Sequence, residues 1–414
     1  MPTPTRSATP LSIPPAPTAP AAFPWIGLLT LAGAIFVSVT SEFLPTGLLP
    51  EMADELDVSL STAGLLITVF AGTVVLATTP LAALTRKYSR KGLVFVVLLV
   101  LALANVLAAI APTYEILVGA RILGGLAHGL FWAVVAAYSA HLVPKHQLGK
   151  AVAITAGGAS AAFVLGVPVG TALGHALGWR VAFGIIAAVV VLLALAVLKF
   201  LPPVDHHVPV KTGEIRIPMH KDRSMRGVVL LCIVIVILLT GQNTYYTYIA
   251  PWLVDAAGFP ESSVAFLLFL FGGAGAIGLV LAGFASDRFP KRGFALALIA
   301  VMASVLVLAA WSANSVVVVV AFVVWGVAFG GIPAMLQTRM LHTASFRTRD
   351  FAAALQTTAF NIGIGGGALL GGLLLDRSGI RSLPVALILF LVVGLAVMVG
   401  TDLARVARAR RLTH

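Results

Sequence analysis

The amino-acid sequence predicts an all-α integral membrane protein with twelve transmembrane helices in two pseudo-symmetric six-helix bundles. Three observations carry this prediction. The composition is 59% hydrophobic and only 10% charged, whereas soluble domains have about a quarter of their residues charged. Apolar stretches of membrane-spanning length recur along the chain, and the basic residues gather in the short loops between them. Most of this chain is therefore expected to lie in lipid.

Each apolar stretch has about 20 residues, the length that an α-helix needs to cross a bilayer. A polar segment with several prolines separates the first six stretches from the last six, and we interpret it as a cytoplasmic linker. The expected organisation is a disordered tail at 1–22, a bundle at 23–200, the linker at 201–226, a second bundle at 227–404 and a basic tail at 405–414. The spans are expected at about 26–49, 62–85, 92–111, 116–142, 150–173, 180–200, 227–250, 263–285, 293–312, 316–340, 350–374 and 383–404.

The net charge of +12 is explained by orientation rather than by a nucleic-acid partner, because the basic residues do not cluster on one soluble face. If the spans alternate in direction, most Lys and Arg residues fall on the side of both termini. Only a few fall on the opposite side, such as Arg180, Arg377 and Arg381. Positive residues stay mostly in the cytoplasm, so both termini are predicted to be cytoplasmic.

The sequence offers no metal-binding or catalytic set. Cys232 is the single cysteine and lies within a span, so one chain can form neither a disulfide framework nor a multi-cysteine metal site. His206 and His207 lie in the linker without further ligands at the spacing of a metal site. We therefore expect no metal, no cofactor and no enzyme activity; a membrane-embedded enzyme, the alternative, would need a catalytic cluster within the spans.

The two halves carry similar loops after their second spans, "AALTRKYSRK" at 82–91 and "GFASDRFPKR" at 283–292. The second loop resembles the G-x3-D-R-x-x-[RK]-[RK] loop of the major facilitator superfamily, through Gly283, Asp287, Arg288, Lys291 and Arg292. In the first loop the match is partial, because Arg86 stands where the superfamily has its acid. The resemblance implies that a charge network latches the inner gate, and solvated loop charges are the alternative. The gating residues expected are Arg86, Arg90, Asp287, Arg288 and Arg292.

Six further motifs appear in order along nearly the whole chain: "SEFLPTGLLPEMADEL", "RILGGLAHGLFW", "LGVPVGTALGHALGWRVAF", "YYTYIAPWLVDAAGF", "LFGGAGAIG" and "FNIGIGGGALLGG". They are similar to the bacterial sugar efflux transporters of the arabinose and drug exporter type, in the twelve-span drug:proton antiporter branch. The resemblance implies the major facilitator fold, a monomer in the bacterial inner membrane, and proton-coupled efflux of small sugars or sugar-like solutes by alternating access. Its partners would be a small-molecule substrate, protons and the lipid bilayer. Efflux of chloramphenicol-type drugs is the alternative.

Ionisable side chains inside a span are costly, so each is a candidate functional residue. Glu42 and Arg121 lie roughly 10 Å and 8 Å inside the outer ends of their spans at about 1.5 Å per residue, and this similar depth permits an ion pair. We expect Glu42 and Arg121 to carry proton coupling, with Glu42 loading a proton outside and releasing it inside. A permanent structural pair is the alternative.

On the fourth span, Arg121, Gly125, His128 and Trp132 recur at steps of four, three and four residues, which places them within about 60° on one helical face. This face carries a permanent cation, an imidazole and an aromatic ring, which is the chemistry of a polar substrate cavity. His128 and Trp132 are therefore expected to bind substrate, and a helix–helix hydrogen bond is the alternative for His128.

Amide and aromatic side chains in the second half predict the rest of the substrate site. The stretch "GQNTYYTYIAPW" in the seventh span combines polar groups with aromatic rings, although an aromatic belt at the membrane interface explains Trp252 better. An aromatic stripe is otherwise more often packing than a site, but amides inside lipid need partners. The substrate-binding residues expected in this half are Gln242, Asn243, Tyr246, Trp325, Gln356 and Asn361.

The stretch "FNIGIGGGALLGG" repeats glycine at every fourth position, at Gly363, Gly367 and Gly371. Helices in lipid associate by close backbone approach at small residues, so these glycines are expected to form a seam. Two alternatives stay open for the seam: static packing, or a surface along which helices slide when the bundles rock.

Overall fold

The structure is a computed structural model, and it describes residues 23–85, 87–144, 147–202, 222, 224–345 and 348–412. The expected tail at 1–22, most of the expected linker and the gating candidate Arg86 lie outside these residues. Of Asp287 and of residues 401–412 the structure describes the helical backbone only.

Within the described residues, twelve helical segments are long and apolar enough to cross a membrane, which confirms the predicted all-α membrane fold. In the first half the spans are α1 (Trp25–Gly47), α3 (Leu60–Leu84), α4 (Arg90–Ala109), α5 (Tyr114–His141), the run α6 (Leu148–Ala161), η2 (Ala162–Gly166) and α7 (Val167–Leu177), and α8 (Trp179–Phe200). In the second half they are α9 (Ser224–Tyr246), α11 (Val264–Arg288), α12 (Pro290–Ala310), the run α13 (Ser315–Gly330) and α14 (Ile332–Thr343), α15 (Arg349–Ser378) and α16 (Leu383–Leu412).

Short helices lie beyond the spans at one end of the molecule. They are α2 (Leu49–Glu55), α10 (Ile249–Pro251), η4 (Trp252–Ala256), η5 (Glu261–Ser263) and η6 (Ile380–Ser382). We call this end the far side and the opposite end, where α1 begins and α8 ends, the linker side. Tight turns on the far side use glycine where the chain needs a positive φ, at Gly178 (φ 91°) before α8 and Gly379 (φ 75°) after α15.

Local sequence explains where several spans begin and bend. Ser59 and Ser89 cap α3 and α4 by accepting hydrogen bonds from the amides of Thr62 and Gly92, which satisfies donors that lack a partner within the helix. The fifth span contains the π-helical turn η2, which ends two residues before Pro168, and the tenth span breaks at Gly331, two residues before Pro333. Proline lacks a backbone N–H, so it favours such interruptions.

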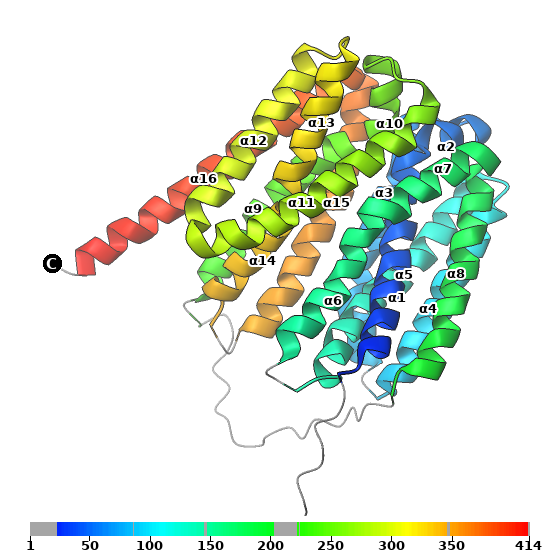
Figure 1. The fold of residues 1–414 in the computed structure, drawn as a ribbon, viewed down its shortest axis with the longest axis horizontal. Helices are drawn as coiled ribbons and strands as arrows, with labels where there is room; N and C mark the ends of the chain where they lie inside the picture. The colour runs from blue at the N-terminus through cyan, green and yellow to red at the C-terminus, as the bar shows by residue number, and fades with distance from the viewer. Residues whose placement is uncertain are drawn as a thin grey trace, which may run out of the picture.

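The two halves lie side by side, with α1 to α8 in one group and α9 to α16 in the other (Figure 1). They pack on each other through α3 against α15 and through α11 against η2 and α7. Thr68 of α3 donates a hydrogen bond of 3.0 Å to the carbonyl of Gly365 on α15. Gly272 of α11 lies so close to η2 that an added Cβ would clash with the carbonyl of Phe163. These contacts lie from the middle of the helices toward the far side.

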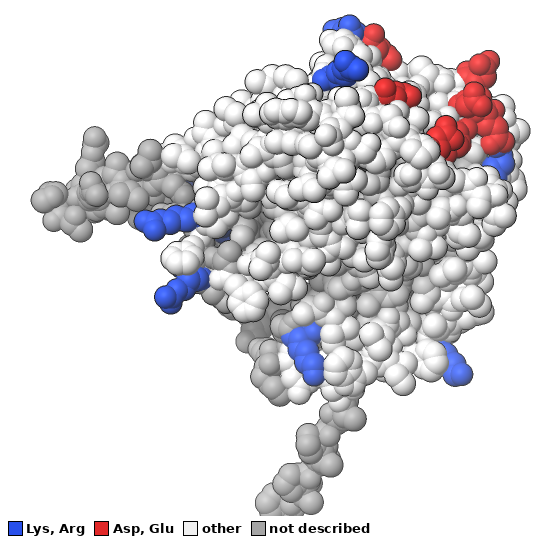
Figure 2. Space-filling view, turned by 45° about the horizontal axis from the view of Figure 1, so that its top comes forward, with Lys and Arg blue, Asp and Glu red and all other residues white. Residues whose placement is uncertain are grey.

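The surface separates into charged ends and an uncharged band between them (Figure 2). The band contains many exposed apolar side chains, such as Leu76 (79% exposed) and Val316 (73%), as a lipid-facing surface requires. Exposed acids on the far side are Asp54, Glu55, Asp57, Glu115, Asp255, Glu261 and Asp376. Exposed basic residues on the linker side include Lys87, Lys150, Lys199, Arg226, Arg288, Arg292 and Arg349.

Candidate proton and substrate site

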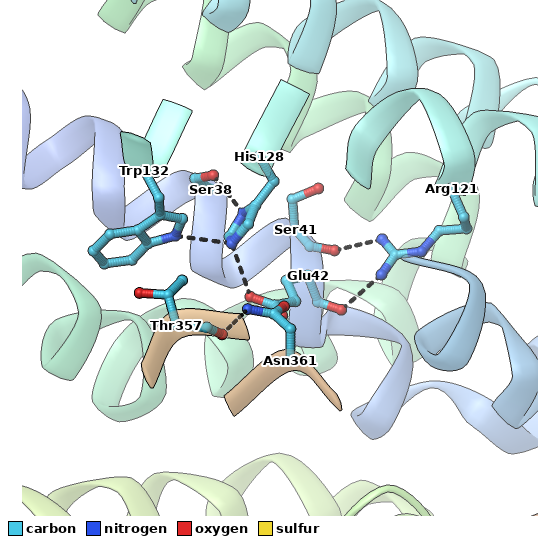
Figure 3. A network of polar contacts seen from close by, with 8 residues as sticks. All are labelled: Ser38, Ser41, Glu42, Arg121, His128, Trp132, Thr357 and Asn361. Carbon is cyan, nitrogen blue, oxygen red and sulfur yellow. Dashed lines mark hydrogen bonds and ion pairs between the residues drawn. The ribbon is translucent and has the colours of Figure 1, made fainter. Parts of the chain in front are cut away.

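The polar face predicted on the fourth span lies against α1 in the interior of the first half. Glu42, Arg121 and His128 are 5%, 3% and 3% exposed, and Figure 3 shows them in one polar network with Ser38 and Ser41. Ser41 and Glu42 of α1 follow Ser38 by three and four positions, so all three lie toward the same side of the helix. The fold therefore brings the carboxyl, the guanidinium and the imidazole together.

Arg121 binds the main chain of α1 rather than the Glu42 carboxylate. Its Nη1 and Nη2 donate hydrogen bonds to the carbonyls of Ser41 (2.8 Å) and Glu42 (2.9 Å). Its Nε reaches the carbonyl of Leu66 on α3 at 3.4 Å, and the guanidinium carbon lies 4.2 Å from the centre of the Phe70 ring. A guanidinium is a fixed array of donors, so Arg121 joins α1 and α3 to α5.

The carboxylate of Glu42 instead faces His128, with 3.3 Å between Oε2 and Nε2. The same Nε2 accepts a hydrogen bond of 2.8 Å from the indole nitrogen of Trp132, and Nδ1 lies 2.8 Å from the hydroxyl of Ser38. Both imidazole nitrogens thus have partners. His128 lies between Glu42 and Trp132 and contacts both of them (Figure 3).

Three supporting residues of this site are absent from the sequence-based set. Ser38 binds His128, and Ser41 donates a hydrogen bond of 2.8 Å to the amide oxygen of Asn105 on α4. Asn105 in turn donates to the carbonyl of Leu101 at 2.7 Å. A signal for Asn105 was present in the sequence, because an amide inside a span needs a partner. The serines carry no such signal, since a hydroxyl can bond to its own helix.

From the second half, α15 contributes the expected residues Gln356 and Asn361, each 8% exposed. Asn361 donates to the carbonyl of Thr357 at 3.0 Å, and its amide oxygen is buried without a partner. It lies one turn from Gly365, which touches α3 through Thr68. Figure 3 includes Thr357 and Asn361 with the network around Glu42. Asn361 therefore lies beside the first-half site, on the helix of the second half that packs against α3.

The other expected residues of the second half form a cluster of their own. Trp325 is fully buried, stacks on Tyr245 at 5.0 Å between ring centres and donates a hydrogen bond of 3.1 Å to Gln242. Tyr246 packs edge-on against Trp325, and Asn243 donates to the carbonyl of Leu239 on its own helix at 2.9 Å. All four residues are therefore packed within the second half, where Gln242 and Trp325 bond to each other, Asn243 bonds to its own helix, and Tyr246 makes ring contacts.

Trp252 differs from the expectation of an interfacial belt. It is 1% exposed and packs edge-on against Tyr245 with 5.3 Å between ring centres. Trp252 is the first residue of the π-helical turn η4, and its ring packs inside the protein rather than at the surface. A belt position would have left the ring at the membrane interface, so this prediction was wrong.

The gating candidates with described side chains lie on the linker side. Arg288 and Arg292 are exposed and Arg90 is half-buried, and Arg288 lies 6.0 Å from the centre of the Phe289 ring. Their role as a latch stays a prediction. Among the described residues, no three His, Cys, Asp or Glu side chains group closely enough to hold a metal ion.

The glycines of α15 belong to two different seams. An added Cβ at Gly363, Gly367 or Gly371 would clash with α9, and at Gly367 it would lie 2.7 Å from Cβ of Asn243. Gly365 instead faces α3, where an added Cβ would lie 3.1 Å from Cβ of Ala71. The repeat at every fourth position therefore packs helices within the second half, and Gly365 packs the halves against each other.

Comparison with known proteins agrees with this architecture. Residues 31–345 and 231–411 match the family model of the Major Facilitator Superfamily. A bacterial homologue of the human lysosomal transporter Spinster, solved in an inward-facing and occupied conformation, superposes with a TM-score of 0.76 over 93% of this chain and 98% of that one, at 15% identity. The chain belongs to the Major Facilitator Superfamily. It is therefore a multi-pass membrane transporter, which confirms the prediction that it is not an enzyme.

Relatives at about 30% identity show which members of the superfamily this chain resembles. A protein of Pasteurella multocida named "Probable sugar efflux transporter" is 33% identical over 375 residues, which are 90% of this chain and 91% of that protein. One of the same name from Helicobacter pylori strain G27 is 32% identical over 83% of this chain and 87% of its own. These relatives confirm the family resemblance that the sequence motifs indicate.

Proposed function

We propose that this protein exports small sugars or sugar-like solutes in exchange for protons, by alternating access, across a bacterial inner membrane with both termini in the cytoplasm. The observation that carries the proposal is the buried contact between Glu42 and His128, with 3.3 Å between the carboxylate and the imidazole. A carboxyl and an imidazole buried within a membrane-spanning bundle mark a proton pathway. The names of the similar proteins, probable sugar efflux transporters, support the substrate class.

In this proposal Arg121 and Glu42 form the coupling centre and the polar groups around it hold substrate. Arg121 fixes the backbone at Glu42, so that the carboxylate changes partners while the helix stays in place. His128 and Trp132 from the first half, with Gln356 and Asn361 from the second, offer donors, acceptors and a ring to a sugar. The unpartnered amide oxygen of Asn361 is an acceptor for a sugar hydroxyl.

The position of the contacts between the halves supports alternating access. The seam at Thr68 and Gly365 joins α3 to α15, and the seam at Gly272 joins α11 to η2. Both consist of small side chains and main chain, so they can separate without the loss of large interlocked side chains. The orientation rests on the exposed basic residues of the linker side, because positive residues stay in the cytoplasm.

The proposal is tested with purified protein in sealed proteoliposomes. Vesicles are loaded with labelled arabinose or with labelled chloramphenicol, and efflux is followed with and without a pH gradient, acidic outside. We expect the gradient to accelerate arabinose efflux and a protonophore to abolish the acceleration. Equal rates with and without the gradient would remove proton coupling. Transport of chloramphenicol without arabinose would replace the substrate class by that of the drug exporters.

A further inference from the structure

The contacts of a single atom, Nε2 of His128, carry a further inference. An indole nitrogen is a donor only, and that of Trp132 lies 2.8 Å from Nε2. Nε2 therefore holds a lone pair and no proton in this conformation. The proton of a neutral imidazole then sits on Nδ1, where it donates to the hydroxyl of Ser38 at 2.8 Å. These contacts describe a neutral His128.

The same lone pair faces the Glu42 carboxyl at 3.3 Å. A carboxylate oxygen and an imidazole lone pair repel each other, and the pair becomes favourable only when a proton lies between them. With a proton on Nε2 the imidazole would attract the carboxylate, but it could no longer accept the indole N–H. Trp132 and Glu42 are therefore partners of Nε2 in alternative proton states.

We propose that proton uptake at the Glu42–His128 pair releases the indole of Trp132, and that Trp132 is the positioning residue through which the proton state is passed to the substrate. The half-buried ring of Trp132 then offers its N–H and its face to a solute instead of to His128. The claim that this exchange couples proton uptake to transport rests on the proposed function. The change of partner at Nε2 of His128 rests on the geometry alone.

The surroundings of His128 leave few other groups that could set its proton state. Among the described residues, the charged or titratable groups that face it are Glu42 on α1 and Arg121 on its own helix. The helix α3 presents the ring of Phe70, 5.2 Å from the imidazole between ring centres. The α15 residues drawn with the network, Thr357 and Asn361, do not titrate.

The exchange is tested without substrate or gradient, by tryptophan emission of the full-length protein in nanodiscs between about pH 5 and pH 9, the range in which imidazole titrates. The contribution of Trp132 is the spectrum of the wild type minus that of Trp132→Phe at each pH. We expect its emission maximum to shift with a single midpoint as the indole loses its acceptor. The matched control is Trp311→Phe, because Trp311 is 58% exposed and its difference spectrum should not change with pH.

A second variant keeps the test decisive if Trp132→Phe does not fold. In Glu42→Gln, which retains Trp132, we expect the pH-dependent part of the total emission to disappear or its midpoint to fall by about one pH unit or more, because the carboxylate that attracts a protonated imidazole is absent. A Trp132 emission that is constant over this range overturns the inference, as does a shift that Glu42→Gln leaves unchanged. Failure of gradient-driven transport with the emission shift intact would instead contradict the proposed function.

Discussion

Arg121 donates a hydrogen bond of 2.9 Å to the main-chain carbonyl of Glu42, and the two side chains form no ion pair. A buried guanidinium is costly unless its donors are satisfied, and here the main chain of two helices satisfies them. The carboxylate of the same residue stays available to His128. Arg121 therefore holds the backbone of α1, and His128 contacts the carboxylate of Glu42.

Replacement of Arg121 should destabilise the protein as well as disable it. Arg121→Ala removes the hydrogen bonds to the carbonyls of Ser41 and Glu42 and leaves both buried. We expect a loss of about 2–4 kcal/mol in the free energy of unfolding, read as a lower midpoint of thermal unfolding in detergent. Arg121→Lys should recover only part of the loss. Its ammonium can donate to one of the carbonyls, but it cannot reach both with the geometry of the guanidinium fork.

The control is Lys199→Ala, since Lys199 is exposed on the linker side. If Arg121→Ala melts at the same temperature as this control, the bracing role of Arg121 is incorrect.

Glu42→Gln should retain counterflow of solute but lose efflux that is driven by the proton gradient. An amide is neutral at every pH, so the variant cannot load and release a proton at this position. We expect counterflow of labelled solute to persist, while gradient-driven efflux falls by roughly tenfold or more, a change equivalent to about 1.4 kcal/mol. The measurement is solute efflux from sealed proteoliposomes over a series of pH values, in which the pH dependence of the wild type should flatten in the variant.

Full proton-driven efflux by Glu42→Gln would remove Glu42 as the proton carrier. Loss of counterflow together with efflux would show instead that the carboxylate is needed for substrate binding.

Gly64→Ala should hold the far side open. Gly64 of α3 lies against the hydroxyl of Tyr248 from the second half, and an added Cβ would clash with it. The hydroxyl is fixed by a hydrogen bond of 2.9 Å to the carbonyl of Ala368, so it cannot move away at no cost. We expect the equilibrium to shift toward the conformation in which α3 and α15 are separated on the far side.

The measurement is the rate at which a membrane-impermeant maleimide labels Ser61→Cys, in a Cys232→Ser background, because Ser61 is buried where α3 meets Gly372. Gly72→Ala on the same helix is the matched control, since nothing lies within 4 Å of its added Cβ. Equal labelling in the two variants would contradict a gate at Gly64 and Tyr248.

Gly367→Ala should weaken the second half rather than shift its conformation. The added methyl would lie 2.5 Å from the carbonyl of Thr240 and 2.7 Å from Cβ of Asn243, both on α9. Overpacking of this kind costs about 1–3 kcal/mol, and we expect a lower midpoint of thermal unfolding with no change in labelling at Ser61→Cys. Gly273→Ala has open space around its Cβ and should unfold no earlier than the wild type, because alanine favours the helix by about 1 kcal/mol.

The sequence by itself determined the class of the fold. Span number and placement follow from segment length and composition, since no lipid-exposed backbone can leave its polar groups unpaired. The polar face of α5 was also predictable, because the spacing of Arg121, His128 and Trp132 repeats with the helical period. Burial of Glu42 beside this face agrees with the expectation that charges inside a span point away from lipid.

Only the tertiary structure decided which partners these groups have. Periodicity fixes the face of a helix that a residue occupies, but not the rotation and register of the neighbouring helix, and these give Arg121 the carbonyl of Glu42 and give the carboxylate to His128. The same limit applies to the glycines of α15, where one sequence stretch serves two seams because α9 and α3 cover different faces. It also applies to Trp252, whose buried ring packs against Tyr245, a contact that periodicity does not predict.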